Sequence, residues 1–127
     1  MGLLLDTHAL LWWLLDSADL PAKTRRLIER ASLAYVSSVS VLEIAIKQRS
    51  GKLPELQLSA NELPSLIEQS QFTPLPVTLA HAAAVAALPD HHRDPFDHLL
   101  IAQAQMEKLA VVTSDPQFAR YSVKTRW

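Results

Sequence analysis

The chain has 127 residues, a formal net charge of −1 and no cysteine, which excludes disulfide bonds and thiolate metal sites. Its 49% hydrophobic and 20% charged residues are typical of a folded globular protein, and the length suits a single domain over residues 1–127. Because the net charge is close to zero, binding to nucleic acid would have to use a local basic patch.

The N-terminal run of apolar residues, 3–15, has neither the basic start of a signal peptide nor the length of a membrane span. Asp6 and His8 also interrupt it. We therefore expect a cytoplasmic protein that has no membrane partner.

Short apolar runs alternate with helical patterns along the chain. The runs predict strands at residues 3–5, 33–36, 72–75 and 109–113, with a further strand at 122–124. The helical patterns cover residues 8–15, 21–31, 40–49, 60–69, 79–88 and 95–108. This alternation predicts a parallel α/β sheet with helices on both faces, and such sheets bind ligands beyond the carboxyl ends of their strands.

Asp6 lies between the first predicted strand and an apolar helix. Asp is a favoured N-cap residue, so capping alone explains its presence there. A carboxylate between two apolar segments also costs free energy unless something pairs with it. Both interpretations stay open.

Glu43 lies beside an apolar helical stripe formed by Val39, Leu42 and Ile46. One interpretation is a surface ion pair with Lys47, four residues further along the helix. The other is a functional acid, because the flanking residues are apolar. The sequence favours neither.

Asp94 and Asp97 begin the predicted helix 95–108. Asp94 precedes Pro95, which is the pattern of an N-cap followed by proline at the first helical position. Asp97 lies in the first turn, where the helix dipole stabilises a negative charge. It also shares a face with Leu100 and Ile101, so we expect it to point toward the sheet.

Asp115 follows the strand at 109–113 and precedes Pro116, so it is also explained as a turn residue. Asp6 and Asp115 both leave the carboxyl ends of predicted strands, while Glu43 and Asp97 project from helices. Four carboxylates in one partly buried cleft would repel one another, and a hard divalent cation would relieve that repulsion. Spacing alone does not establish that they converge.

Four blocks of sequence resemble, in order, the motifs of the PIN-domain family, and specifically toxins of the VapC type from bacterial type II toxin–antitoxin pairs. The blocks are "LLLDTHALLWWL", "VSSVSVLEIAIK", "HRDPFDHLLIAQA" and "VVTSDPQF". The resemblance spans the whole chain. It implies a PIN-like (Rossmann-like) three-layer α/β/α fold with a short, mostly parallel sheet of four to five strands.

The same resemblance implies a metal-dependent endoribonuclease in which Mg²⁺ or Mn²⁺ activates a water to cleave RNA phosphodiesters. Matched by position, the catalytic and metal-binding acids are Asp6, Glu43, Asp97 and Asp115. The family pattern tolerates variation at the fourth acid. His8 is a departure, because many relatives have Asn there.

Further residues of these blocks are candidates for supporting roles. Thr7 and Ser38 could donate hydrogen bonds to the site, Asp94 could cap or support it, and Arg93 could contact phosphate or simply lie on a solvated face. The adjacent histidines at 91 and 92 could bind metal, but we expect them to face solvent, as adjacent histidines in loops more often do.

The resemblance also implies a small cognate antitoxin, an RNA substrate and a homodimer as partners. The segment 9–15 is apolar all round and contains Trp12 and Trp13, which suits either a buried helix or an interface.

Two other functions compete with the nuclease. One is a PIN-fold binding module with weak catalysis. The other is a phosphatase, which would need a second Asp at position 8, where this chain has His.

Overall fold

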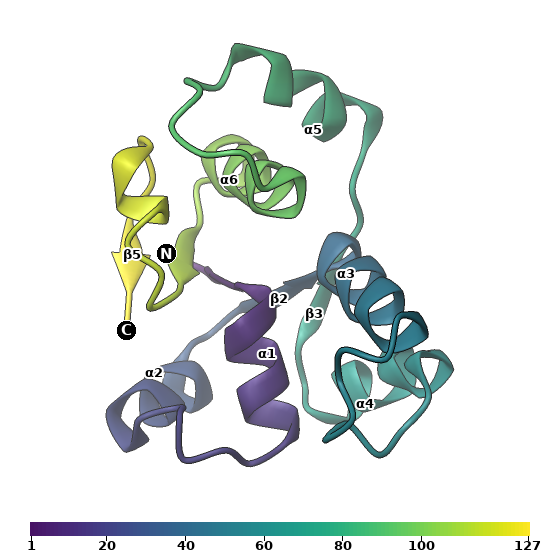
Figure 1. Ribbon diagram of the computed structural model, residues 1–127. Helices are drawn as coiled ribbons and strands as arrows, with labels where there is room; N and C mark the ends of the chain where they lie inside the picture. The colour runs from purple at the N-terminus through teal and green to yellow at the C-terminus, as the bar shows by residue number, and fades with distance from the viewer.

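The computed structural model describes all residues, 1–127, and contains one sheet in the order β3-β2-β1-β4-β5 (Figure 1). Every neighbouring pair of strands is parallel, which confirms the expected parallel α/β architecture. The strands are β1 (Leu3–Leu5), β2 (Ala34–Ser37), β3 (Thr73–Leu75), β4 (Ala110–Val112) and β5 (Thr125–Arg126).

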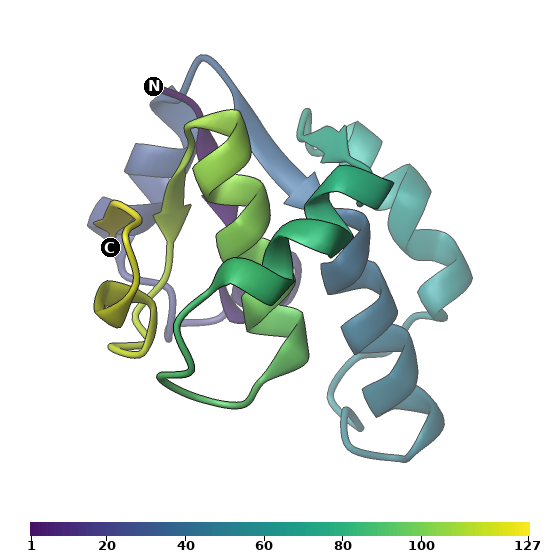
Figure 2. The ribbon, with the colours of Figure 1, turned by 90° about the horizontal axis from the view of Figure 1, so that it is seen from above.

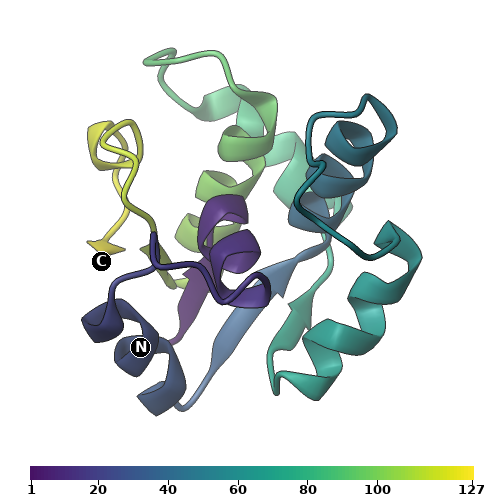
Figure 3. The same ribbon diagram turned by 60° about the horizontal axis from the view of Figure 1, so that its bottom comes forward.

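Helices cover both faces of this sheet. The α-helices are α1 (Thr7–Leu14), α2 (Ala22–Arg30), α3 (Ser38–Arg49), α4 (Leu63–Gln69), α5 (Leu79–Ala84) and α6 (Pro95–Glu107). Short 3₁₀ helices are η1 (Ala60–Glu62), η2 (Val85–Ala87) and η3 (Phe118–Arg120). Helices α1, α2 and α4 lie on one face (Figure 3), and α5 and α6 lie on the other (Figure 2). No helix has the length and apolar character needed to cross a membrane.

The strands separate two hydrophobic cores because successive side chains point to opposite faces. In β1, Leu3 and Leu5 belong to the larger core, which α1, α2 and α4 complete. Leu4 belongs to the smaller core with Val111 of β4 and Leu100 of α6. All three layers of the fold therefore meet at β1, the central strand.

The last predicted strand is wrong in position. Residues 121–123 form a bend after η3, where Val123 N donates to Tyr121 O, and Lys124 lies between this bend and the strand. The strand begins only at Thr125, and the pairing is anchored by Val111 N donating to Lys124 O at 2.8 Å. The other predicted strands and helices agree with the structure to within two residues, with η1 and η2 forming part of two of the predicted helices.

The predicted apolar stripe of α3 is also wrong for two of its three members. Leu42 is 52% exposed and Ile46 is 39% exposed, whereas Val39 is buried. The reason is that α3 packs between the two cores: Val39 joins the smaller one and Ile44 the larger one. The face between them is buried instead, and it carries Glu43 inward with it.

Asp94 is the N-cap of α6, as predicted. Its Oδ1 accepts hydrogen bonds from Phe96 N at 2.9 Å and from Asp97 N at 3.2 Å. We expect Asp94→Ala to destabilise the protein by about 1 kcal/mol relative to Asp94→Asn, because Asn keeps the cap and both changes remove the same charge. Urea unfolding of the two variants measures this difference. Equal stabilities would show that the cap contributes nothing.

Candidate active site

The sheet has a topological switch point between β1 and β4. The chain builds β1, β2 and β3 outward in one direction and then places β4 and β5 on the opposite side of β1. Open α/β sheets bind ligands at such a point, beyond the carboxyl ends of the strands. Asp6 directly follows β1 and Asp115 follows β4, so the topology brings these two predicted acids to the switch point.

Asp6 is both a helix cap and a buried carboxylate. It is 4% exposed, and its Oδ1 accepts a hydrogen bond from Ala9 N at 2.7 Å at the start of α1. Burial raises the pKa of Asp6, and the negative charge of Asp115 raises it further, while hydrogen bonds from Thr113 and Ala9 and the nearby His8 oppose the rise. The fold thus holds a desolvated acid at the switch point.

Thr113 connects the two acids that leave the sheet. Its side chain is buried, hydrogen-bonds to the Asp6 carboxylate and accepts a bond from Asp115 N at 3.0 Å. Thr113 belongs to the block "VVTSDPQF" that resembles the family motif, but the sequence did not predict its contact with Asp6. The only signal for it was its position two residues before Asp115.

Asp97 lies in the first turn of α6 and points inward, as predicted from the face it shares with Leu100. Its side chain is 16% exposed. Burial, followed by the charges of Asp94 and Asp115, raises the pKa of Asp97 to about 7, although its hydrogen bond to His92 acts in the opposite direction. Asp115 therefore raises the pKa of both Asp6 and Asp97, which places its carboxylate within electrostatic reach of each of these two acids.

His92 orients Asp97, and the expectation that it faces solvent is wrong. Its Nε2 lies 3.1 Å from Asp97 Oδ2, and its Nδ1 lies 2.8 Å from the hydroxyl of Tyr121. With the Tyr121 hydroxyl donating to Nδ1, the neutral ring donates from Nε2 to the carboxylate. His98 Nε2 further donates to the backbone carbonyl of His92 at 2.7 Å. Tyr121 is 29 residues from His92, so no local pattern predicted this network.

Glu43 combines both interpretations of its sequence. It is 5% exposed, yet its Oε2 accepts from Lys47 Nζ at 2.7 Å, so the predicted pair with Lys47 exists around a buried rather than an exposed acid. One turn earlier on α3, Ser40 Oγ accepts from Thr7 Oγ1 at 3.0 Å, which links this helix to α1 directly after Asp6. Glu43 is thus neutralised by Lys47 rather than paired with another candidate group.

Of the four predicted supporting residues, two have a role next to a candidate acid and two do not. Thr7 is buried and directly follows Asp6 in the sequence. Asp94 caps α6, the helix that carries Asp97. Ser38 instead accepts a hydrogen bond from Val77 N at 3.0 Å, in the loop that follows β3. Arg93 is exposed.

The donor chemistry of the site fits a hard divalent cation, although its geometry is not a closed coordination sphere. No group of three or more His, Asp or Glu side chains is arranged to hold a metal ion. Asp6, Asp97 and Asp115 nevertheless supply only oxygen ligands, and two of them carry pKa values raised by burial and by neighbouring negative charge. A bound cation relieves both of these costs.

The fold and the site together define a parallel α/β domain with an acidic centre at its switch point. The model of the PIN domain family matches residues 3–124, so the chain belongs to the PIN domain family. A comparison with curated proteins gives no match in sequence.

Solved structures share the fold over nearly the whole chain. VapBC2 from Rickettsia felis, bound to a DNA fragment from its promoter, has a TM-score of 0.73 at 15% identity and covers 99% of this chain and 98% of its own. FitAcB from Neisseria gonorrhoeae has a TM-score of 0.67 at 23% identity, with coverages of 97% and 95%. A toxin–antitoxin complex from Klebsiella pneumoniae has a TM-score of 0.60 at 16% identity, with coverages of 89% and 86%.

Proposed function

We propose that the protein is a VapC-type toxin, a Mg²⁺- or Mn²⁺-dependent endoribonuclease. The observation that best supports this proposal is that Asp6 and Asp115 follow the two strands beside the switch point, and that the charge of Asp115 raises the pKa of both Asp6 and Asp97. Membership of the PIN family supports a nuclease. The fold shared with a toxin–antitoxin complex supports the role of toxin.

In this proposal Asp6, Glu43, Asp97 and Asp115 would hold the divalent ion. When bound, such an ion polarises the phosphodiester, lowers the pKa of a water and stabilises the leaving oxygen. Thr113 and His92 keep Asp6 and Asp97 in fixed orientations, which is the task of hydrogen bonds to ligating carboxylates.

Lys47 has a distinct part in this arrangement. Its ammonium group pairs with the buried Glu43 carboxylate at 2.7 Å. If Glu43 were a ligand of the cation, the Lys47 ammonium group would be available to a phosphate oxygen of the substrate.

We further propose a small antitoxin protein and a second copy of the chain as partners, acting in the cytoplasm. The half-buried indoles of α1 support a protein contact at this end of the fold. Trp13 packs edge-on to Phe72 with ring centroids 5.4 Å apart, and Trp12 packs on Trp127 at 5.8 Å. Both indoles keep part of their surface accessible, as aromatic residues at interfaces do.

Cleavage of single-stranded RNA by the purified chain tests the proposed activity. We expect cleavage with Mg²⁺ or Mn²⁺, complete loss with EDTA and recovery when metal is restored in excess. A DNA strand of the same sequence distinguishes a ribonuclease from a general nuclease. Asp90→Asn, which removes an exposed acid outside the site, serves as the control with full activity. Undiminished cleavage in EDTA contradicts the metal mechanism.

A catalytically weak PIN-fold binding module is the second candidate. It is favoured by the tight pairing of Glu43 with Lys47 and by the open arrangement of the acids. Expression in a bacterial host separates the two functions. A toxin that cleaves RNA arrests growth as the wild type and not as Asp97→Asn, whereas a binding module arrests growth equally with both.

A further inference from the structure

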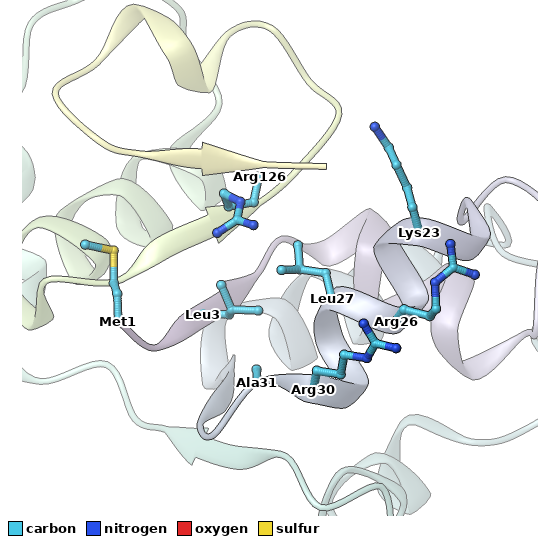
Figure 4. A pocket seen from close by; sticks show the side chains of 8 residues that line it. All are labelled: Met1, Leu3, Lys23, Arg26, Leu27, Arg30, Ala31 and Arg126. Carbon is cyan, nitrogen blue, oxygen red and sulfur yellow. The ribbon is translucent and has the colours of Figure 1, made fainter.

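A strongly basic cavity lies away from the carboxylates, between β1, α2 and β5 (Figure 4). Its volume is about 340 Å³. Four of its eight lining residues are cations and none is an acid. These cations, which we call the basic pocket, are Lys23, Arg26, Arg30 and Arg126.

The basic pocket follows from the amphipathic pattern of α2. Lys23, Arg26 and Arg30 recur at i, i+3 and i+7 on one side of the helix, while its other side buries Ile28 in the core. Arg126 projects from β5 toward the same cavity (Figure 4). All four cations are exposed, so their charges are available to a ligand.

None of these four cations has an acidic partner within the protein. The only lysine and arginine ion pairs are Arg25 with Asp16 and Lys47 with Glu43. Glu29 is the sole acid on α2, and it does not line the cavity. Cations on neighbouring helical turns repel one another, so this arrangement does not serve stability. In a chain with a net charge of −1 it forms a local site for an anion.

We propose that the basic pocket binds backbone phosphates of the RNA substrate, outside the cleavage site; this inference rests on the proposed ribonuclease function. Three of the four cations are arginines, whose planar groups match phosphate oxygens in pairs. Lys23 to Arg30 extends about 10 Å along α2, which spans about three phosphates of a stacked strand. A row of cations about 10 Å long matches the regularly spaced phosphates of a nucleic-acid backbone better than it matches a single carboxylate.

The position of the basic pocket relative to Asp6 supports a shared ligand. The pocket lies beside Leu3 at the start of β1, and Asp6 follows the end of the same strand, which is about 10 Å long. The carboxylates repel RNA when no cation neutralises them. Cations at the start of this strand offset that repulsion for the phosphates that lie away from the cleaved bond.

Binding of RNA to a cleavage-deficient protein tests the proposal. In the Asp6→Asn background with EDTA, fluorescence anisotropy measures the affinity for a labelled single-stranded RNA of about 16 nucleotides. We expect Arg26→Ala/Arg30→Ala to weaken binding about tenfold and to reduce the salt slope by about 0.7 for each phosphate that the variant no longer neutralises. Alanine is the best helix former, so the double variant keeps α2.

A matched double variant and a competing polyanion complete the test. Arg49→Ala/Lys52→Ala removes the same charge from the exposed last residue of α3 and the loop that follows it, and is expected to change RNA affinity much less. Equal losses in both double variants overturn the proposal. So does unchanged RNA affinity together with lost binding of a polyglutamate peptide, which would identify an acidic protein segment as the ligand.

The same experiment separates this inference from the proposed activity. If the wild type does not cleave RNA but RNA affinity still depends on Arg26 and Arg30, the ribonuclease proposal fails and the basic pocket stands. If the wild type cleaves RNA and the affinity is indifferent to these arginines, the activity stands and the basic pocket fails.

Discussion

Asp6→Asn is expected to reduce metal-dependent RNA cleavage at least about 100-fold while leaving α1 intact. Loss of groups that merely orient metal ligands already costs about 10–100-fold, and Asp6 is proposed as a ligand itself. Asn caps a helix as well as Asp does, so the bond from Ala9 N survives the change. Cleavage of a labelled RNA under single-turnover conditions measures the loss, with Asp90→Asn as the active control.

The stability of this variant is expected to change in the opposite direction. Burial raises the pKa of Asp6, so ionising this carboxyl costs more free energy in the folded protein than in the unfolded chain. Asn removes the charge, and we therefore expect metal-free Asp6→Asn to unfold at a higher temperature than the wild type. Asp6→Ala, which also loses the cap, is expected to be about 1 kcal/mol less stable than Asp6→Asn.

Two outcomes would contradict these expectations for Asp6. Cleavage within a few-fold of the wild type would show that the acid is a cap and not a ligand. A metal-free Asp6→Asn protein less stable than the wild type would show that the carboxylate stabilises the fold. The expected combination, an inactive but more stable variant, is characteristic of a residue retained for function.

The elements of the fold were predictable where the pattern is local and strong. Three-residue apolar runs such as Leu3–Leu5 mark buried strands, and Asp94 with Pro95 marks a helix start, because capping acts within one turn. The stripe of α3 was predicted wrongly because periodicity does not say which side of a helix is buried when two cores meet on it. The two-residue strand β5 is defined by its pairing with β4 rather than by its own residues.

The site was predictable only as a set of candidates. Asp6, Asp97 and Asp115 each have a local explanation as a cap or turn residue, and the structure shows that the capping role and burial coexist in Asp6. What sequence spacing could not supply was the switch point, because it depends on which strand lies beside β1. The contacts of His92 and Thr113 were also out of reach, since each joins segments that approach only in the folded chain.

Asp97 is expected to make the stability of the metal-free protein fall as pH rises from about 5 to about 8. Burial and the charges of Asp94 and Asp115 raise the pKa of Asp97 from 3.8 to about 7. Between these two values the folded protein binds more protons than the unfolded chain. Its contribution to stability is therefore fully present below about pH 4 and is lost as the pH rises through about 7.

The Asp97→Asn variant isolates this effect. Urea unfolding in EDTA at several pH values is expected to give a wild-type stability that declines more steeply with pH than that of Asp97→Asn, by at most about 1.4 kcal/mol per pH unit for one proton. Asp90→Asn is expected to follow the wild type. Added Mn²⁺ is expected to reverse the wild-type trend, because the cation competes with the proton for Asp97 and binds more tightly as the pH rises. Parallel pH profiles for the wild type and Asp97→Asn would mean that the Asp97 carboxylate is already ionised at low pH. Burial of Asp97 would then carry no free-energy cost that a bound metal ion could relieve.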